Sequence, residues 1–321
     1  MTKAVVLHET GGPENLKWED WEVAQPTQGE ALVRHTFVGL NYNDTNYRAG
    51  IIPLPQLPAV IGREAAGVVE AVGADVREIG MRVAYAGHFG AYGEFNNIPA
   101  DRLVPIPDDV ADDLAAAMLL KGMTAQYLVR QTKELKAGDT MLYHAAAGGV
   151  GLIACQWANH LGATVIGTVS TREKAAIAKE HGCQHVIVYS EDDFLGQVKE
   201  LTDGQGVDYV CDAVGRDTIE KSMQCMRHHG VLVVYGSASG APPPETWAKL
   251  PVERFLVKAS LPGYTRTRER LLAAANDLFE VVKSGAVRIE INQRYELKEA
   301  AQAHIDLQGR KTTGSTVFEI T

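Results

Sequence analysis

The sequence predicts a two-domain α/β protein, with a β-rich domain first and a doubly wound parallel sheet after it. The chain has 321 residues, more than one domain usually holds. In its first third, Gly and Pro separate short stretches of alternating apolar and polar residues, which is typical of strands and turns. From residue 138 to about 260, almost wholly apolar strand patterns alternate with helical ones. That alternation predicts a parallel sheet covered by helices on both faces.

The first domain is predicted to be a rolled or barrel-like sheet. Residues 31–40 alternate and then turn, and residues 65–72 and 82–85 form two more apolar strand patterns. A helix is expected at 112–120, because it begins with two acidic residues and a helix N-terminus favours negative charge. A second helix is expected at about 124–131.

The second domain follows from the alternation of apolar runs and amphipathic stretches. We expect strands at 140–144, 164–169, 185–188, 207–211 and 231–235, with helices at 153–161 and 172–181 among the segments between them. An amphipathic helix is expected at 267–284, and short strands after it. The apolar strand at 231–235 is a candidate sheet edge at which two copies of the chain pair.

The composition excludes several classes of function. A content of 45% hydrophobic residues is enough to form a core, so the chain as a whole is not disordered. The net charge of −9 argues against binding to nucleic acid or to an anionic membrane surface. No apolar run is long enough for a membrane helix, and the strand-like start leaves no room for a signal peptide. The cysteines form no CxxC pair, so we expect core thiols and a cytoplasmic location.

A glycine-rich turn follows the strand at 140–144 and leads directly into a helix. Its sequence, Ala145 to Gly151, is the dinucleotide-binding fingerprint with Ala146 in place of the first Gly. Gly148 allows the backbone to approach a pyrophosphate, and Gly151 allows the helix to pack closely on the strand. The N–H groups of the helix N-terminus then face the phosphates. The alternative is a tight turn without a ligand.

The end of the next strand indicates which dinucleotide binds. An Asp or Glu at this place would bind the ribose 2′-hydroxyl of NAD, but the sequence has Ser170 and Thr171, followed by Arg172 and Lys174. The two cations can pair with a 2′-phosphate. We therefore predict NADPH as the cofactor. The alternative for the cations is a solvated start of a helix, and Glu173 fits its first turn.

Several separate stretches, spread over nearly the whole chain, resemble the zinc-independent quinone oxidoreductases of the medium-chain dehydrogenase/reductase superfamily, the zeta-crystallin-like branch. The resemblance implies a GroES-like catalytic domain at 1–122, completed by 265–321, and a Rossmann NADPH-binding domain at 123–264. The matching stretches are Gly11–Glu14, Gly39–Thr45, Gly62–Val69, Ala145–Gly151, Asp212–Gly215 and Gly236–Ser237.

The same comparison predicts that there is no metal site. Zinc-dependent relatives have a Cys ligand where this sequence has Asn41, and Gly-His-Glu where it has Gly62, Arg63 and Glu64. They also have closely spaced cysteines for a structural zinc, which are absent between Tyr85 and Leu103. Zinc needs thiolate and imidazole ligands, which Asn and Arg do not supply.

The resemblance also implies roles for individual residues. Asn41 and the loop Tyr42, Asn43 and Asp44 are expected at the nicotinamide ribose and the substrate. Tyr42 or Tyr47 is a possible proton source, and Arg63 either brings a charge to the substrate or pairs with Glu64 or Asp44. The remaining residues expected at NADPH are Tyr127, Gly149, Val150, Lys174, Tyr189, Val214, Gly236, Ser237, Leu261 and Arg310. For Tyr127 and Tyr189 the alternative is packing at a domain edge.

The predicted function is transfer of hydride from NADPH to a quinone, without zinc, by a homodimeric enzyme. Two departures from the family pattern favour an alternative acceptor, an enone or alkenal double bond. Asn46 stands where the family commonly has a Tyr, and Ile52 stands where an aromatic residue is expected to stack on a flat ring. The alternative from another class is a non-catalytic, NADPH-binding regulatory protein.

Overall fold

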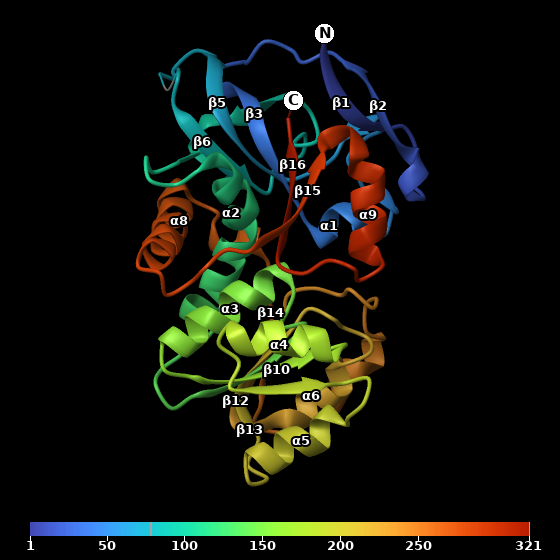
Figure 1. Cartoon of the computed structure of the whole chain (residues 1–321), viewed down its shortest axis with the longest axis vertical. Coiled ribbons are helices and arrows are strands. Elements are labelled where there is room, and N and C mark those ends of the chain that lie inside the picture. The colour runs from blue at the N-terminus through green and yellow to red at the C-terminus, as the bar shows by residue number, and fades with distance from the viewer. Residues whose placement is uncertain (78, 321) are drawn as a thin grey trace. The chain divides into compact units, whose positions relative to one another are not determined.

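The computed structural model describes residues 1–77 and 79–320, and these form two compact units (Figure 1). Unit 1 contains Met1–Lys121, Thr265–Asn276 and the residues from Ile289 onward. Unit 2 contains Gly122–Tyr264 and Asp277–Arg288. The sequence analysis placed all of 265–321 with the first domain, whereas residues 277–288 lie in unit 2.

Unit 1 is built on two sheets. The larger has the strand order β15–β16–β3–β5–β6–β8, with β7 also paired to β3, and the smaller has the order β2–β1–β4. The strands are β1 (Thr2–Leu7), β2 (Leu16–Trp21), β3 (Glu30–Leu40), β4 (Ala59–Val60), β5 (Glu64–Val72), β6 (Arg82–Ala86), β7 (Phe95–Pro99), β8 (Val104–Pro105), β15 (Ile291–Glu296) and β16 (Ser315–Glu319). The short helices are η1 (Pro13–Asn15), α1 (Tyr42–Arg48), η2 (Ala100–Arg102), η5 (Leu297–Glu299) and α9 (Ala300–Gln308).

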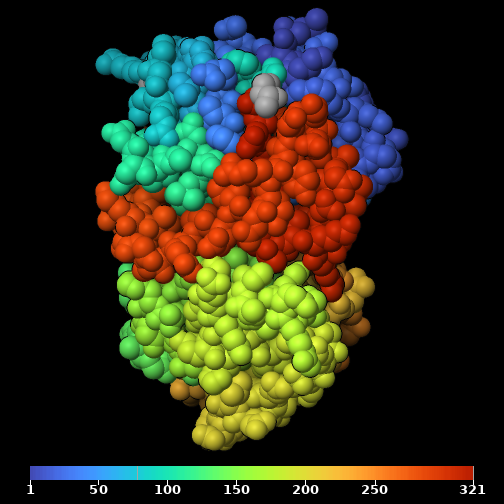
Figure 2. Space-filling model, in the orientation of Figure 1, coloured from blue at the N-terminus to red at the C-terminus, as the bar shows by residue number. Residues whose placement is uncertain are grey.

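Strand β3 is central because its apolar alternation places one face in the core. Ala31, Val33 and Val38 are fully buried there, beside Tyr85 and Phe318 from neighbouring strands. One edge of β3 pairs with β5, and the other pairs with β7 over its first residues and antiparallel with β16 over its last ones. The C-terminal segment therefore completes a sheet that the first third of the chain begins. In Figure 2 the red C-terminal residues lie against the blue N-terminal ones.

The structure changes the prediction for one of two long helices. Helix α2 (Asp112–Gln126) continues directly into a π-helical turn, η3 (Tyr127–Thr132), so the predicted break between 120 and 124 does not occur. Helix α8 (Arg268–Lys283) lies within the predicted range. Gly122 does not end α2 because it is a packing position: a Cβ there would lie 2.4 Å from Leu278 Cδ2.

Unit 2 is a parallel sheet with the order β11–β10–β9–β12–β13–β14. The order reverses between β9 and β12, as in a doubly wound fold, where right-handed crossovers place helices on both faces. The strands are β9 (Thr140–His144), β10 (Thr164–Val169), β11 (His185–Val188), β12 (Val207–Asp212), β13 (Met226–Val234) and β14 (Phe255–Lys258). The helices are α3 (Gly149–His160), α4 (Arg172–Glu180), α5 (Phe194–Leu201), α6 (Ile219–Cys225), η4 (Pro244–Lys249) and α7 (Leu261–Tyr264).

The predicted edge at 231–235 is wrong. Strand β13 lies between β12 and β14, and β14 is the outer strand. Strand β14 has only four residues, and Phe255 in it is 55% exposed. Its apolar run is too short to predict a strand from the sequence. Among the residues described, no helix is both long and apolar enough to cross a membrane.

We expect Gly67→Ala to destabilise unit 1. A Cβ at Gly67 would lie 2.0 Å from the carbonyl oxygen of Arg34 on the neighbouring strand, so the two strands would have to separate. Overpacking of this kind costs about 1–3 kcal/mol or more. Gly263→Ala is the matched control, because its Cβ would meet only Ser260 Oγ at 3.7 Å. Thermal unfolding should show a clear fall in Tm for Gly67→Ala alone, and equal Tm values would contradict the close approach.

Candidate functional site

The glycine-rich turn of unit 2 lies at the C-terminal end of β9 and leads into α3. Ala145 adopts a left-handed φ of 58°, and Gly148 N–H donates to Ala145 O at 2.9 Å. A Cβ at Gly151 would lie 2.5 Å from Ala145 O and 2.6 Å from Ala146 O, so only Gly allows the helix to start this close to the turn. The N–H groups of Gly149, Val150 and Gly151 form the first turn of α3, which has no intrahelical acceptors for them.

The second loop at this edge follows β12, the neighbour of β9 across the reversal of strand order. The carboxylate of Asp212, fully buried, accepts hydrogen bonds from Val214 N and Gly215 N, both at 2.9 Å. Gly236 and Ser237 follow β13, the next strand. Parallel doubly wound sheets bind ligands in the crevice at the carboxyl ends of the strands where their order reverses. The predicted Gly148–Gly151 and Val214 flank that place.

The network behind Asp212 keeps this edge rigid. Its Oδ2 accepts from Thr218 Oγ1 at 2.7 Å and from Ser222 Oγ at 2.8 Å. The buried ring of His144, the last residue of β9, lies 2.9 Å from Ser222 Oγ through Nε2 and 2.8 Å from Thr168 Oγ1 through Nδ1. Three strand ends are therefore joined beneath the loops that end them. Sequence analysis did not find His144 or Ser222 because their roles depend on contacts between distant strands.

The loop after β10 brings the predicted 2′-phosphate residues together. Thr171 caps α4 by accepting from Lys174 N at 3.3 Å. Arg172, whose side chain is 81% exposed, makes a bidentate contact with Glu191 at 2.8–3.1 Å. The carbonyl of Ser170 accepts from Ser190 Oγ at 2.9 Å. Glu191 is a partner that the sequence analysis missed.

Four further predicted residues occupy separate places. Tyr127 is 2% exposed, and its ring stacks on Tyr264 with 4.4 Å between centroids, which fits the packing alternative. Tyr189 follows β11 and is 40% exposed, at the same sheet edge as the nucleotide turn. Leu261 begins α7 in unit 2, and Arg310 follows α9 in unit 1 with a left-handed φ of 59°.

In unit 1, Asn41 belongs to a buried polar cluster between β3, β5 and α2. The fully buried Glu64 accepts from Asn41 Nδ2 at 2.8 Å, from Lys121 Nζ at 3.1 Å and from Leu120 N at 2.7 Å. Glu64 is thus fully occupied. The alternative that it pairs with Arg63 is wrong, because neighbouring residues at a strand start point to opposite faces of the sheet.

The carboxylate of Asp44 is buried in α1, where few hydrogen bonds replace those it would make with water. Its Oδ2 accepts from Asn41 N at 2.9 Å and from Tyr92 hydroxyl at 3.2 Å, and within the described chain its Oδ1 has no partner. Burial raises the pKa of Asp44 to about 7, against the opposing effects of the Asn41 hydrogen bond and the Arg63 and Lys121 charges. Tyr92 also contacts His304 Nε2 at 2.9 Å, and burial lowers the pKa of His304 to about 3.

Arg63 contacts the predicted Tyr47 and two residues that the sequence analysis missed. Its Nη1 donates to the Tyr47 hydroxyl at 3.3 Å, and its Nε and Nη2 both donate to Gly87 O. The guanidinium lies 5.3 Å from the Tyr47 ring centroid and 5.4 Å from that of Phe89. Tyr42 and Asn43 are exposed at the start of α1. Tyr47, Arg63 and Phe89 lie in three separate segments, so no local sequence signal marks this cluster.

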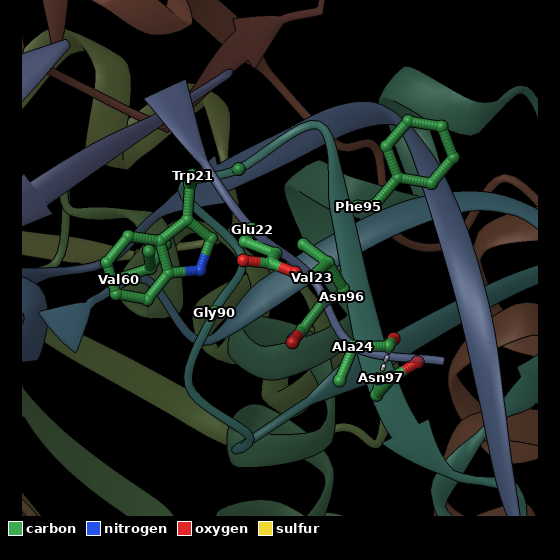
Figure 3. Close-up of a pocket in the computed structure, with 10 residues that line it drawn as sticks. Trp21, Glu22, Val23, Ala24, Val60, Gly90, Phe95, Asn96 and Asn97 are labelled. Carbon is green, nitrogen blue, oxygen red and sulfur yellow. Dashed lines mark hydrogen bonds between the residues drawn. The ribbon is translucent and has the colours of Figure 1, made fainter. Parts of the chain in front are cut away.

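A hollow of about 170 Å³ in unit 1 lies apart from all of these residues (Figure 3). Trp21, Glu22 and Ala24 line it from the segment after β2, and Phe95 and Asn97 line it from β7. Asn97 Nδ2 donates to Ala24 O at 2.8 Å across it. No predicted site residue lines the hollow, so it adds nothing to the site. No group of three His, Cys, Asp or Glu side chains in residues 1–77 and 79–320 is placed to hold a metal ion.

Comparisons with known proteins agree with this architecture. Residues 27–108 match the model of the alcohol dehydrogenase GroES-like domain, and residues 149–277 match that of the zinc-binding dehydrogenases. The chain is 47% identical to a quinone oxidoreductase of Pseudomonas aeruginosa and 44% identical to a 2-haloacrylate reductase of a Burkholderia species, with 99% of both chains covered in each case. It is also similar to the solved structure of Escherichia coli quinone oxidoreductase complexed with NADPH, with 42% identity, 99% coverage of both chains and a TM-score of 0.96.

We expect the stability contributed by Asp44 to fall as the pH rises from about 4 to 7. Its pKa is higher in the folded than in the unfolded protein, so the folded state holds the proton more tightly over this range. Relative to Asp44→Asn, which does not titrate, the wild type should lose at most about 1.4 kcal/mol per pH unit there and then level off. Tm values of both proteins between pH 4.5 and 8 measure this difference, and His304 affects both alike. A difference that stays constant with pH would contradict a protonated Asp44.

Proposed function

Since the chain belongs to the quinone oxidoreductase family of the medium-chain dehydrogenase/reductase superfamily, we propose that it reduces a quinone with NADPH and without zinc. The observation on which this depends is the edge of the unit 2 sheet. There a helix N-terminus, a backbone turn that only Gly151 permits and an exposed Arg172 follow adjacent parallel strands. This combination suits a phosphate-rich dinucleotide.

The residues of unit 2 divide the binding of NADPH among them. The backbone of Gly148, Gly149, Val150 and Gly151 would receive the pyrophosphate, and Arg172 with Lys174, Ser170 and Thr171 would receive the 2′-phosphate. Val214, Gly236 and Ser237 would contribute backbone contacts, with Tyr127, Tyr189 and Leu261 as further contacts. Arg310, which the family resemblance also implies at NADPH, belongs to unit 1. When bound, NADPH supplies the hydride. The side chain of Arg172 is held by Glu191 and exposed, so it can exchange that partner for a phosphate.

The acceptor residues are proposed in unit 1. Reduction of a quinone to a hydroquinone takes up one hydride and one proton. The Tyr47 hydroxyl accepts a hydrogen bond from Arg63, so its own proton is free to be donated. Asn41 is held in place by Glu64, and Tyr42, Asn43 and Asp44 complete the loop. An amide at 41 and a guanidinium at 63 do not bind zinc, so the reaction proposed is reduction of an electron-poor acceptor.

A second candidate function is reduction of an activated carbon–carbon double bond. Asn46 is buried in α1, where its carbonyl accepts from Ile51 N and Ile52 N. Neither Asn46 nor Ile52 offers a ring for stacking on a quinone. The 44% identity to a 2-haloacrylate reductase supports this candidate. If NADPH binds but no acceptor is reduced, the regulatory function is favoured.

We further propose a cytoplasmic homodimer that forms through the outer strand of the unit 2 sheet. Strand β14 has an unpaired edge within the described chain, with Phe255 55% exposed and nearby Val252 79% exposed. Unpaired edges and exposed apolar side chains favour pairing with a second chain. The free, buried cysteines support a reducing compartment.

We expect rapid oxidation of NADPH with 1,4-benzoquinone, a naphthoquinone or an ortho-quinone, and slow oxidation of NADH. In Arg172→Ala the KM for NADPH should rise about tenfold, because a charge-assisted contact is worth roughly 1.5–3 kcal/mol. The KM for NADH should not change. Lys221→Ala, which removes another exposed, ion-paired cation of unit 2, is the control. The loss of absorbance of the reduced nicotinamide measures the rate of oxidation in each case. Turnover of a short enone alone would favour the second candidate, and equal effects on both cofactors would refute the role of Arg172.

The two glycines of the turn should differ in their effects. Gly148→Ala should weaken NADPH binding about tenfold with little change in Tm, since its Cβ meets only Ala145 O, at 3.2 Å, and would otherwise occupy the space proposed for the pyrophosphate. Gly151→Ala should lower Tm without ligand, because its Cβ would collide with two backbone carbonyls. Calorimetric titration and thermal unfolding separate the two effects. A Gly148→Ala protein that binds NADPH normally would argue against the proposed position of the pyrophosphate.

A further inference from the structure

Arg63 is a half-buried cation without a counterion. No carboxylate among residues 1–77 and 79–320 lies within ion-pair distance of its guanidinium, whereas Arg82 pairs with Asp112 and Arg34 with Glu70 in the same unit. The neighbouring Glu64 is occupied by Lys121. Removing a cation partly from water without neutralising it is costly. Such a cation is well suited to bind an anion from outside the chain.

The guanidinium is fixed in orientation by the peptide of Gly87. Its Nε and Nη2 donate to Gly87 O at 3.1 and 2.8 Å, and Gly87 N donates back to Arg63 O at 2.7 Å. Nη1 uses one hydrogen on the Tyr47 hydroxyl. A guanidinium has five N–H donors, so one hydrogen remains on each terminal nitrogen. Carboxylates and related oxyanions bind to such paired donors with two oxygens.

The aromatic rings beside Arg63 cover part of its guanidinium without neutralising the positive charge. Tyr47 and Phe89 meet edge to face with 4.8 Å between their centroids, and both lie within cation–π distance of Arg63. Aromatic rings orient a cation but do not cancel its charge. An ion pair formed beside them is screened less than one in open water.

The other charges near Arg63 do not neutralise it. Asp44 is buried behind it, and because burial raises its pKa to about 7 it is protonated in part of the population at neutral pH. Burial of the half-buried His88, together with the charges of Arg102 and Arg63, lowers its pKa, against the effect of Asp101. The guanidinium of Arg102 donates to the carbonyl oxygen of Thr265. The charge balance at this surface is therefore positive.

We propose that Arg63 determines specificity by binding an anionic group of the acceptor, so that the preferred substrates are electron-poor molecules with a carboxylate or sulfonate beside the reducible quinone or double bond. This inference rests on the proposed reductase function. Tyr47 and Phe89 lie beside the guanidinium on one side, and its two free terminal hydrogens bind two oxygens of the anion. Neutral quinones remain substrates but make no ion pair with Arg63.

The test compares 1,4-naphthoquinone with 1,4-naphthoquinone-2-sulfonate, using wild type, Arg63→Gln and Arg63→Lys. For Arg63→Gln we expect the ratio of kcat/KM for the sulfonate to kcat/KM for the neutral quinone to fall 10- to 100-fold, the effect of losing a charge-assisted contact to the anion, on top of any loss that both quinones share through the Tyr47 contact. Arg63→Lys should restore part of the sulfonate activity. Since each quinone is compared with itself across variants, the difference in their reduction potentials cancels. Arg34→Gln, which removes a paired surface cation of the same unit, should affect neither.

Two results would overturn the inference. An equal loss for both quinones in Arg63→Gln, with an unchanged Tm, would mean that Arg63 supports the fold of the site rather than binding an anion. Direct titration of the sulfonate into the protein saturated with NADP⁺, which has no hydride to transfer, provides a readout without turnover. If wild type reduces no quinone but binds the sulfonate at least tenfold more tightly than Arg63→Gln does, the anion site stands and the quinone reductase function fails. If the two proteins bind the sulfonate equally, the anion site is refuted whatever the activity.

Discussion

The polar part of unit 1 depends on the hydrogen bonds that one buried carboxylate, that of Glu64, accepts. It has no exposed surface, and its hydrogen bonds connect the end of β3 through Asn41, its own strand β5, and helix α2 through Leu120 and Lys121. Losing one partner would leave a buried charge, a change that typically costs several kcal/mol. The close contact also needs a small residue, since a Cβ at Gly39 would lie 2.5 Å from Glu64 Oε2. With Glu64 engaged in this way, Arg63 has no carboxylate partner in the described part of the chain.

Unit 2 uses the same device at the end of a parallel strand. Asp212 is also a fully buried carboxylate, and it accepts two backbone N–H groups and two hydroxyls. These contacts fix the loop after β12, whose backbone would otherwise be free to move. In both units the loops with proposed functions thus depend on a satisfied acid below them. Hydrogen-bonded buried networks give a single rigid arrangement, which binding sites require.

Local sequence patterns identified the features that depend on a few consecutive residues. The turn at 145–151 needs Gly151 for a backbone approach, and such a requirement is visible in one sequence. Features that depend on contacts between distant segments were not predictable. Gly122 resembles a helix end, but the structure places the side chain of Leu278 against it within a continuous helix. The Tyr47–Arg63–Phe89 cluster joins three segments, and β14 is an edge only because no further strand covers it.

The pairing of β16 with β3 has a consequence for the order in which the chain folds during synthesis. Nearly all of unit 2 is one continuous stretch, so it can form as soon as its residues leave the ribosome. Unit 1 must wait, because β3 lacks one neighbour until the last strand has been made. In that interval the edge of β3 and its apolar face are open to other chains. Newly made protein is therefore more prone to aggregation until β16 has been made, and a chain without β16 would keep β3 exposed.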